Sequence, residues 1–366
     1  MAYFPDVQKI PFEGPDSKNP LAYRYYDRER MVEGQRMEDY LRIAVCFWHT
    51  FCWEGEDQFG AKVFDRPWLK SDDPMQLAFE RVEAGFEFME KLGTKFYAFH
   101  NLDVAPEGNS IAEHDANLST VAERLASEME RTGIELLWGT TNLTRNPRYM
   151  SGAATNPNPE IFSYAAAQVK KTFDVTHQLG GHNFVLWGGR EGYETILNTD
   201  MRREMDQLAR FLTMIADYKE KIGFKGQLLL EPKPCEPSKH QYDFDSATVY
   251  AFLQRYGLEN AYKLNIEGNH ATLAGHTFSH EIAYAYATQM FGSIDVNAGD
   301  MLLGWDTDQF AIDPTEMRYL LYIMLQNGGF SGGGGFNLDT KVRRQSTDLV
   351  DLFYAHISGI DTLAKA

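Results

Sequence analysis

Cysteine is scarce in this chain, and no two cysteines have the spacing of a structural zinc or redox site. The 366 residues include 3 cysteines, Cys46, Cys52 and Cys235. This odd and sparse set argues against a disulfide framework. Cys46 lies within an apolar run, so we expect it to pack in the core. Because disulfides persist only in oxidising compartments, we predict a cytoplasmic location.

The chain also lacks a secretory signal, a membrane-length apolar run and an excess of positive charge. Its first residues show no basic stretch followed by an apolar segment. Lys and Arg number 35 against 52 Asp and Glu, which gives a formal net charge of −17. Such a surface repels nucleic acid and anionic membranes, so we expect neither as a partner. Hydrophobic residues make up 43%, enough for a large core.

Short strand-like segments, most of them apolar and each ending in or followed by polar residues, recur along the chain. There are eight, at residues 43–48, 95–99, 134–138, 184–187, 227–230, 264–266, 293–297 and 336–339. Successive runs begin roughly 30 to 50 residues apart, which leaves room for one helix between them. Helical spacing of apolar residues predicts helices over 75–92, 159–179, 201–222 and 315–325.

This alternation predicts an α/β fold, a (β/α)8 TIM barrel of eight parallel strands. We expect residues 1–35 to form an extension packed on it and 36–366 to form a single catalytic barrel. A doubly wound sheet often carries GxGxxG after its first strand, and none is present here. The glycine-rich stretch 332–335 precedes the last strand, so we expect a flexible connection.

The segment 263–270 has the strongest concentration of ligand-type side chains. Residues 264–266 are predicted to form a buried strand, followed by Glu267 and His270. Both could bind one divalent metal, and the second carboxylate oxygen of Glu267 could bind another. Taken alone, the segment fits an ordinary polar loop after a strand better than a metal site, and the rest of the chain changes that balance.

Comparable polar residues follow several other predicted strands. They are His100, Asp103, Glu231, Lys233, Asp295, Asp306, Asp308 and Asp339. In a barrel all of them lie at the face where catalysis occurs. So many carboxylates would repel one another strongly in one cavity, unless cations neutralise them or some are surface charges. An oxygen-rich ligand set with one imidazole and no cysteine suits Mg²⁺, Mn²⁺ or Co²⁺ better than zinc.

The residues leave alternatives open for three of these features. Asp306 and Asp308 could form a solvated acidic turn instead of pointing together into a site. His100 with Asp103 could be a packed histidine or a general acid/base whose tautomer is set by the carboxylate. Lys233, between two prolines, could neutralise a glutamate or hold a substrate oxygen.

Longer motifs then resemble those of the xylose isomerases, in particular the class II branch with its long N-terminal extension. The motifs lie at 187–195, 231–234, 269–276 and 304–308, and the similarity runs from about Phe4 to the C-terminus. The resemblance implies aldose–ketose isomerisation, D-xylose to D-xylulose and also D-glucose to D-fructose, by a hydride shift after ring opening. It implies two divalent cations per subunit (Mg²⁺, Mn²⁺ or Co²⁺), an aldose sugar as substrate and a homo-oligomer, a tetramer or dimer.

The resemblance also implies roles for individual residues. One metal site matches Glu231, Glu267, Asp295 and Asp339. A second matches Glu267, His270, Asp306 and Asp308, so that Glu267 bridges the two. His100 and Asp103 match a ring-opening pair, and Lys233 matches a contact to the sugar's carbonyl oxygen.

Positions matching the substrate pocket are Trp48, Phe59, Trp138, Thr140, Val185 and Trp187. Of these, Trp48 and Trp187 match pocket walls, and Phe59 matches an aromatic that reaches into a neighbouring subunit. Trp138, Thr140 and Val185 match positions that shape size selectivity. Core packing is the alternative role for the apolar ones, and the residues alone favour it for Trp138 and Val185.

The sequence departs from the family pattern in two places. The loop 331–335 is one residue longer, which bears on the placement of Asp339. The chain stops at Ala366, where family members continue as a helical arm; we expect that arm to be absent or truncated, so that either the sequence is shortened or its assembly is weaker than usual.

Three other functions are alternatives to the isomerase. A rhamnose isomerase would use a similar metal-dependent barrel. An abasic-site endonuclease needs a basic surface, which the charge of −17 disfavours. A catalytically inactive sugar-binding homologue is disfavoured because every ligand type is retained.

Overall fold

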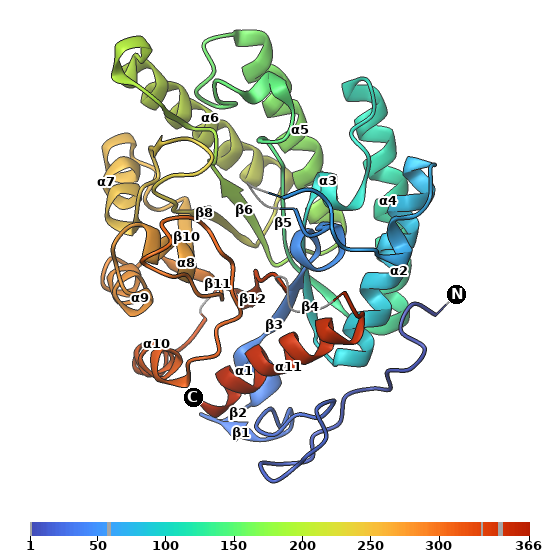
Figure 1. The fold of residues 1–366 in the computed structure, drawn as a ribbon. Coiled ribbons are helices and arrows are strands. Elements are labelled where there is room, and N and C mark those ends of the chain that lie inside the picture. Colours follow the sequence, from blue (N-terminus) through green and yellow to red (C-terminus); the bar gives the residue numbers. More distant parts are fainter. Residues whose placement is uncertain (1, 57–59, 331, 343–346) are drawn as a thin grey trace.

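Eight parallel strands close into a barrel at the centre of the molecule (Figure 1). The computed structural model describes residues 2–56, 60–330, 332–342 and 347–366. The barrel strands are β3 (Ile43–Cys46), β4 (Phe96–His100), β5 (Glu135–Thr140), β6 (Asn183–Trp187), β8 (Gln227–Glu231), β10 (Tyr262–Glu267), β11 (Phe291–Asp295) and β12 (Phe336–Leu338). Closure occurs where β12 pairs with β3, Phe336 opposite Ile43. The prediction of a (β/α)8 barrel is confirmed.

An outer ring of helices surrounds the strands (Figure 1). Its members are α2 (Pro74–Leu92), α4 (Ile111–Thr132), α5 (Pro159–Gln178), α6 (Met201–Ile222), α7 (Ser246–Tyr256), α9 (Phe278–Ala287), α10 (Pro314–Gln326) and α11 (Val350–Lys365). The four helices predicted from apolar spacing agree with α2, α5, α6 and α10 to within one residue at each end. Helices α2 and α6 end at Gly93 and Gly223, whose positive φ angles of 82° and 71° suit only glycine well.

Short elements lie between these long ones, several of them over the carboxyl ends of the strands. They are β1 (Met31–Val32), β2 (Gln35–Arg36), α1 (Met37–Leu41), α3 (Asn101–Val104), β7 (Gly192–Tyr193), β9 (His240–Gln241), α8 (Gly268–Leu273), a π-helical turn at Trp48–Cys52, and 3-10 turns at Pro67–Leu69, Pro147–Tyr149 and Ile196–Asn198. Because α3, α8 and the π-helical turn follow β4, β10 and β3 almost directly, they hold polar side chains above the barrel.

The barrel interior is filled by a small apolar cluster. Its members are Ala44, Cys46, Trp48, Phe96, Ala98, Leu137, Trp138, Val185 and Leu229. Cys46 is fully buried among them, as predicted. This packing fills the barrel interior below the mouth at the carboxyl ends of the strands.

The glycine-rich stretch before β12 is closely packed, and the expectation of a flexible connection was wrong. A Cβ on Gly334 would lie 1.9 Å from the carbonyl oxygen of Gly292, and one on Gly335 would lie 2.5 Å from that of Arg42. The Arg42 Nε also donates to the Gly334 carbonyl oxygen at 2.6 Å. Glycine is needed here because backbone meets backbone with no space for a side chain.

The N-terminal segment packs on the outside of the helical ring. The ring of Phe4 lies 5.2 Å from that of Phe353 in α11 and 5.6 Å from that of Phe88 in α2. The carboxylate of Asp361 accepts hydrogen bonds from three successive backbone amides of residues 24–26, at 2.8 to 2.9 Å. The division into an extension and one barrel domain stays a prediction. Within the described ranges, no helix combines the length and apolarity needed to cross a membrane.

Candidate active site

A cavity of about 350 Å³ opens at the carboxyl ends of the barrel strands. Most of the predicted site residues line it together, namely Trp48, His100, Asp103, Trp138, Thr140, Val185, Trp187, Glu231, Lys233, Glu267, His270, Asp306, Asp308 and Asp339. Asp295 is fully buried at the end of β11 and has an oxygen within 4.8 Å of ligand atoms of Glu267 and Asp339. Phe59 lies outside the described residues. The volume is at the small end of the range for ligand pockets.

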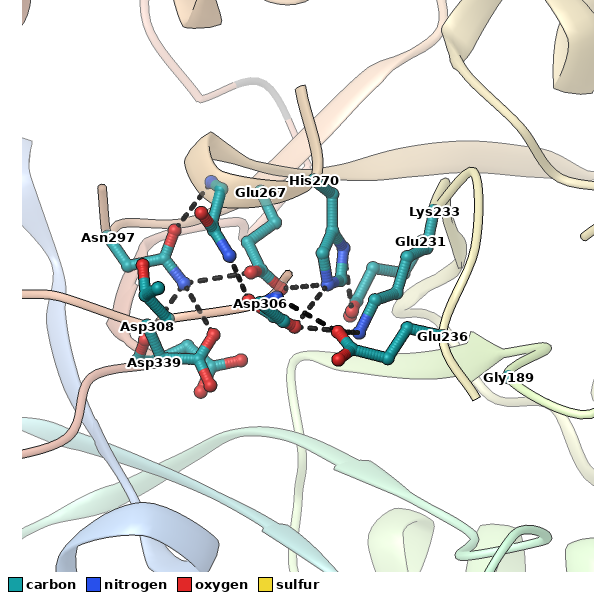
Figure 2. Close-up of polar contacts among 12 residues, drawn as sticks. Gly189, Glu231, Lys233, Glu236, Glu267, His270, Asn297, Asp306, Asp308 and Asp339 are labelled. Atoms are coloured by element: carbon teal, nitrogen blue, oxygen red, sulfur yellow. Dashed lines mark hydrogen bonds and ion pairs between the residues drawn. The ribbon is translucent and has the colours of Figure 1, made fainter. Parts of the chain in front are cut away.

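Glu267 stands at the centre of the acidic cluster (Figure 2). It belongs to three groups of side chains whose ligand atoms lie within 4.8 Å of one another. These groups are Glu231–Glu267–His270, Glu267–Asp306–Asp308 and Glu267–Asp295–Asp339. The position follows from strand β10, which ends at Glu267 and turns immediately into α8, so the carboxylate projects over the barrel axis. A residue shared by three clusters has the geometry that bridging two ions requires.

His270, Asp306 and Lys233 form one side of this cluster (Figure 2). The His270 Nε2 lies 3.0 Å from Glu267 Oε2 and 3.3 Å from Asp306 Oδ2. The Lys233 Nζ donates to Asp306 Oδ2 at 2.7 Å and lies 5.1 Å from the centre of the Trp187 ring. Burial alone would raise the pKa of Asp306, but the ammonium of Lys233 and the interactions with His270 together outweigh burial and hold that pKa well below its usual value.

His49, Asp339 and Asp308 form the opposite side. The His49 Nε2 lies 2.9 Å from Asp339 Oδ1 and 3.1 Å from Asp308 Oδ2. Trp48 Nε1 donates to the same Asp339 oxygen at 2.7 Å. Burial would raise the pKa of Asp339, but the His49 imidazole outweighs it and the pKa is lowered. Asp308 has a positive φ of 45°, a conformation that Asp tolerates better than most residues and that turns its side chain toward the cluster.

The amide of Asn297, just after β11, ties several of these groups together (Figure 2). Its Nδ2 donates to Glu267 Oε1 at 2.8 Å, to the Asp339 carbonyl oxygen at 2.9 Å and to Asp308 Oδ1 at 3.3 Å. Its Oδ1 accepts the backbone N–H of Asn269 at 2.8 Å. Asn297 is fully buried, so both ends of the side chain are held. One amide therefore orients three carboxylate-bearing residues of the cluster.

Lys233 and Lys341 pair with Asp306 and Asp308, but carboxylates and burial dominate the surroundings of Glu267 and Asp295. Burial raises the pKa of Glu267 well above its usual value, and the carboxylates of Asp306 and Asp339 raise it further. Burial also raises the pKa of Asp295 well above its usual value, and the carboxylates of Glu231 and Asp339 raise it further. Asp295 Oδ2 and His270 Nδ1 are buried without a hydrogen-bond partner among the described residues. Divalent cations would neutralise these charges and use the unpaired atoms, so the residues fit metal ions.

His100 and Asp103 lie at another part of the cavity, on β4 and the start of α3. Asp103 Oδ2 accepts the His100 backbone N–H at 2.7 Å and lies 2.9 Å from His100 Nδ1. Asp103 is fully buried, and although burial would raise its pKa, the interaction with His100 lowers it. Because the carboxylate engages Nδ1, Nε2 is the nitrogen available to the cavity. The pair has the arrangement of an oriented acid/base.

Aromatic side chains form the apolar wall beside these groups. The ring of Trp48 lies 4.6 Å from that of His100 and 5.3 Å from that of Trp138. Trp138 and Val185 are buried in the barrel interior and also line the cavity, so core packing and pocket wall are compatible. The Thr140 hydroxyl donates to the Val185 carbonyl oxygen at 2.6 Å, which links β5 to β6.

Residue patterns alone missed several groups in this site. His49 follows the first segment and Asn297 ends the seventh, but neither was assigned a function. Lys341, whose Nζ lies 2.5 Å from Asp308 Oδ2, was also missed. A general signal existed for the first two, because polar residues at the ends of barrel strands face the mouth. Which carboxylates these residues contact depends on the closure of the barrel.

Comparisons with known proteins identify related sequences over nearly the whole chain. A xylose isomerase of Pseudoalteromonas atlantica is 57% identical over 362 residues, covering 99% of this chain and 82% of that protein. A xylose isomerase of Pseudomonas syringae pv. syringae is 57% identical over 366 residues, covering 100% of this chain and 83% of that protein. No family model matches the sequence.

Solved structures share the fold at much lower identity. A D-psicose 3-epimerase superimposes with a TM-score of 0.58 at 12% identity, covering 89% of this chain and 98% of that one. The 3-keto-D-glucoside 4-epimerase of E. coli gives a TM-score of 0.57 at 10% identity, covering 89% and 98%.

Proposed function

The chain belongs to the xylose isomerase family, and from this premise we propose that it interconverts D-xylose and D-xylulose, with D-glucose and D-fructose as a poorer pair. The observation that carries the proposal is the convergence of seven ligand-type residues on the barrel mouth, with Glu267 common to three groups. The His100–Asp103 pair and the aromatic wall share the same cavity. An aldose of five carbons is a suitable size for that space.

We propose two divalent cations per subunit, held by Glu231, Glu267, Asp295 and Asp339 and by Glu267, His270, Asp306 and Asp308. The donor set is dominated by carboxylate oxygens, which favours Mg²⁺, Mn²⁺ or Co²⁺ over zinc. When bound, such cations polarise sugar oxygens and lower the pKa of a bound water.

His100 acts in ring opening under this proposal. With Nδ1–H donated to Asp103, the neutral imidazole presents Nε2 to the cyclic sugar, can accept the proton of the anomeric hydroxyl, and as the imidazolium can return a proton to the ring oxygen as its bond to C1 breaks. The Asp103 carboxylate, whose pKa is lowered, stays ionised and stabilises the imidazolium that forms. Asp103 thus sets the tautomer and orientation of the base.

Lys233 and the tryptophans serve the hydrogen transfer between C2 and C1. Burial would lower the pKa of Lys233, but Asp306, Glu267 and Glu236 raise it, so the ammonium stays charged. A fixed positive charge there stabilises negative charge that develops on the carbonyl oxygen. Trp48, Trp138 and Trp187 keep water from the path, which suits transfer of hydrogen as hydride rather than as a solvent-exchangeable proton.

We also propose a homo-oligomer, a tetramer or dimer, in which Phe59 reaches a neighbouring subunit's cavity. A reducing location such as the cytoplasm is proposed because Cys46, Cys52 and Cys235 are all unpaired.

The experiment that tests the function is turnover of D-xylose deuterated at C2, with Mg²⁺ and with a chelator. We expect ketose formation only with the metal and retention of the label at C1. Tritium entering C1 from solvent would instead indicate an enediol and refute the hydride shift.

A variant separates ring opening from the later step. His100→Asn should slow turnover of the cyclic sugar about 10² to 10⁴-fold, the range for loss of a general acid/base. The same substitution should slow turnover of an aldose supplied in its open-chain form much less than turnover of the cyclic sugar. Equal losses with both substrates would argue against this role of His100.

A further inference from the structure

A second group of metal-ligating side chains lies outside the barrel mouth, where α7 and α9 begin next to each other (Figure 1). It comprises His276, His280 and Glu281, with Asp245 beside them. Asp245 is the N-cap of α7, and Glu281 is in the first turn of α9. We propose that these four side chains bind a transition-metal ion such as Zn²⁺, separately from the acidic cluster at Glu267.

Both carboxylates are oriented by the backbone at the start of α7. Glu281 Oε2 accepts the Ser246 backbone N–H at 2.9 Å and its hydroxyl at 2.5 Å. Asp245 Oδ1 accepts the Thr248 backbone N–H at 2.7 Å. In each case one oxygen is held and the other, Glu281 Oε1 or Asp245 Oδ2, faces the imidazoles. This is the pattern of supporting hydrogen bonds that orients ligands in metal sites.

His276 hydrogen-bonds Asp245, whereas the contacts of both imidazoles with Glu281 suit a shared ion better than direct hydrogen bonds. His276 Nε2 lies 3.1 Å from Asp245 Oδ2 and 3.9 Å from Glu281 Oε1, and His280 Nε2 lies 4.0 Å from Glu281 Oε1. The two distances to Glu281 Oε1 are too long for hydrogen bonds. Ligand atoms around a tetrahedral Zn²⁺, with bonds of about 2.0–2.1 Å, lie roughly 3.3 Å apart. For His276, His280 and Glu281, whose ligand atoms lie within 4.8 Å of one another, small side-chain movements reach that spacing.

Burial and charge favour a cation at this point. Glu281 is only 3% exposed, so its carboxylate is removed from water. The rings of His276 and His280 stack, with centroids 4.7 Å apart. Two protonated imidazoles at that separation would repel each other, whereas neutral imidazoles bound to an ion would not. The ion would thus supply the positive charge that Glu281 and Asp245 face.

The ligand types predict a different metal from that of the barrel mouth. Two imidazole nitrogens and two carboxylate oxygens suit Zn²⁺, Ni²⁺ or Cu²⁺ rather than Mg²⁺. An ion here would join the first turn of α9 to the start of α7. It would also hold one end of the segment 270–276, which carries His270 at its other end. The site therefore has a stabilising function, independent of catalysis.

The test compares Zn²⁺ binding by the full chain and by His280→Gln, in excess Mg²⁺. His280 is 54% exposed in its side chain, so the substitution leaves the core intact. At a free Zn²⁺ concentration between the two dissociation constants, we expect wild type to bind close to one equivalent of Zn²⁺ more than the variant, measured by elemental analysis after equilibrium dialysis. In calorimetric titration, the corresponding affinity should fall at least about tenfold. Zn²⁺ that enters the acidic cluster is common to both proteins and cancels.

A matched control removes an exposed imidazole elsewhere. His177→Gln, near the end of α5, should bind as much Zn²⁺ as wild type. A Zn²⁺-dependent rise in melting temperature should likewise persist in His177→Gln and diminish in His280→Gln. Equal stoichiometry in wild type and His280→Gln, or equal loss in both variants, would overturn the proposal.

Discussion

The crowding of carboxylates around Glu267 predicts opposite effects of one substitution on stability and on metal binding. Glu267→Gln keeps the shape of the side chain and an oxygen that can accept from Asn297 Nδ2, now 2.8 Å from Glu267 Oε1. It removes one negative charge from a cluster in which Asp306 and Asp308 lie close by. We therefore expect the metal-free protein to become more stable and metal binding to be largely lost, together with isomerase activity.

The size of the stabilisation follows from the distances. Ligand oxygens of Glu267, Asp306 and Asp308 lie within 4.8 Å of one another. At an effective dielectric constant of about 20, two charges 4.8 Å apart repel by about 3.5 kcal/mol. Protonation can relieve this repulsion, at a cost of about 3.7 kcal/mol at pH 7 for a glutamate of ordinary pKa about 4.3. Whether Glu267 is ionised or protonated in the metal-free protein, the free energy of unfolding should therefore rise by about 3.5 kcal/mol when its charge is removed.

That gain converts into a measurable melting shift. An unfolding entropy of about 2.1 cal/mol/K per residue, over 366 residues, gives about 0.77 kcal/mol/K. The metal-free variant should therefore melt about 4 to 5 °C higher than metal-free wild type. With Mg²⁺, wild type should gain stability by mass action, whereas the variant should gain little.

The assay is thermal unfolding at pH 7, at one scan rate, in chelator and in Mg²⁺, with turnover of D-xylose measured in parallel. Glu123→Gln, at an exposed position of α4, is the control for loss of one charge and should shift melting by less than about 1 °C. A lower melting temperature for metal-free Glu267→Gln would refute the electrostatic reasoning. An undiminished Mg²⁺ effect would refute the bridging role.

Two further predictions concern groups that orient the cluster. Asn297→Ala removes the donor shared by Glu267, Asp308 and Asp339, so metal dissociation constants from calorimetry should rise about 10 to 100-fold; an unchanged constant would contradict the orienting role. Lys233→Met removes the ammonium that, against burial, lowers the pKa of Asp306. The pKa of Asp306 should rise in this variant. As the pH is lowered, metal affinity should therefore begin to fall at a higher pH than in wild type. An unshifted pH profile of the metal affinity would exclude this coupling.

Much of the barrel could be predicted from local patterns. Strands such as 227–230 and 264–266 are short apolar runs bounded by polar residues, and helices such as 201–222 end at a glycine. These signals depend on neighbouring residues alone, so they can be recognised in the sequence before the fold is known. The positions of Glu231, Glu267 and Asp339 at strand ends follow from the same signals, because parallel strands in a barrel all end on one face.

The local signals failed where packing between distant segments decides the structure. Gly334 and Gly335 indicated flexibility, but they are glycines because strand β11 and residue 42 approach their backbone closely. His49 contacts Asp339 only because β12 closes the barrel against β3. Neither effect can be read from neighbouring residues.

The sequence by itself determined the order of strands and helices, the supply of carboxylates and imidazoles, and the strand ends that carry them. These depend on periodicity and residue chemistry, which are local properties. Only the tertiary structure decided that Glu267 is shared by three groups, that Asn297 orients them, and that His276 and His280 meet Asp245. Those contacts depend on barrel closure and on the adjacency of α7 and α9, because distances between remote segments are set by packing of the whole chain.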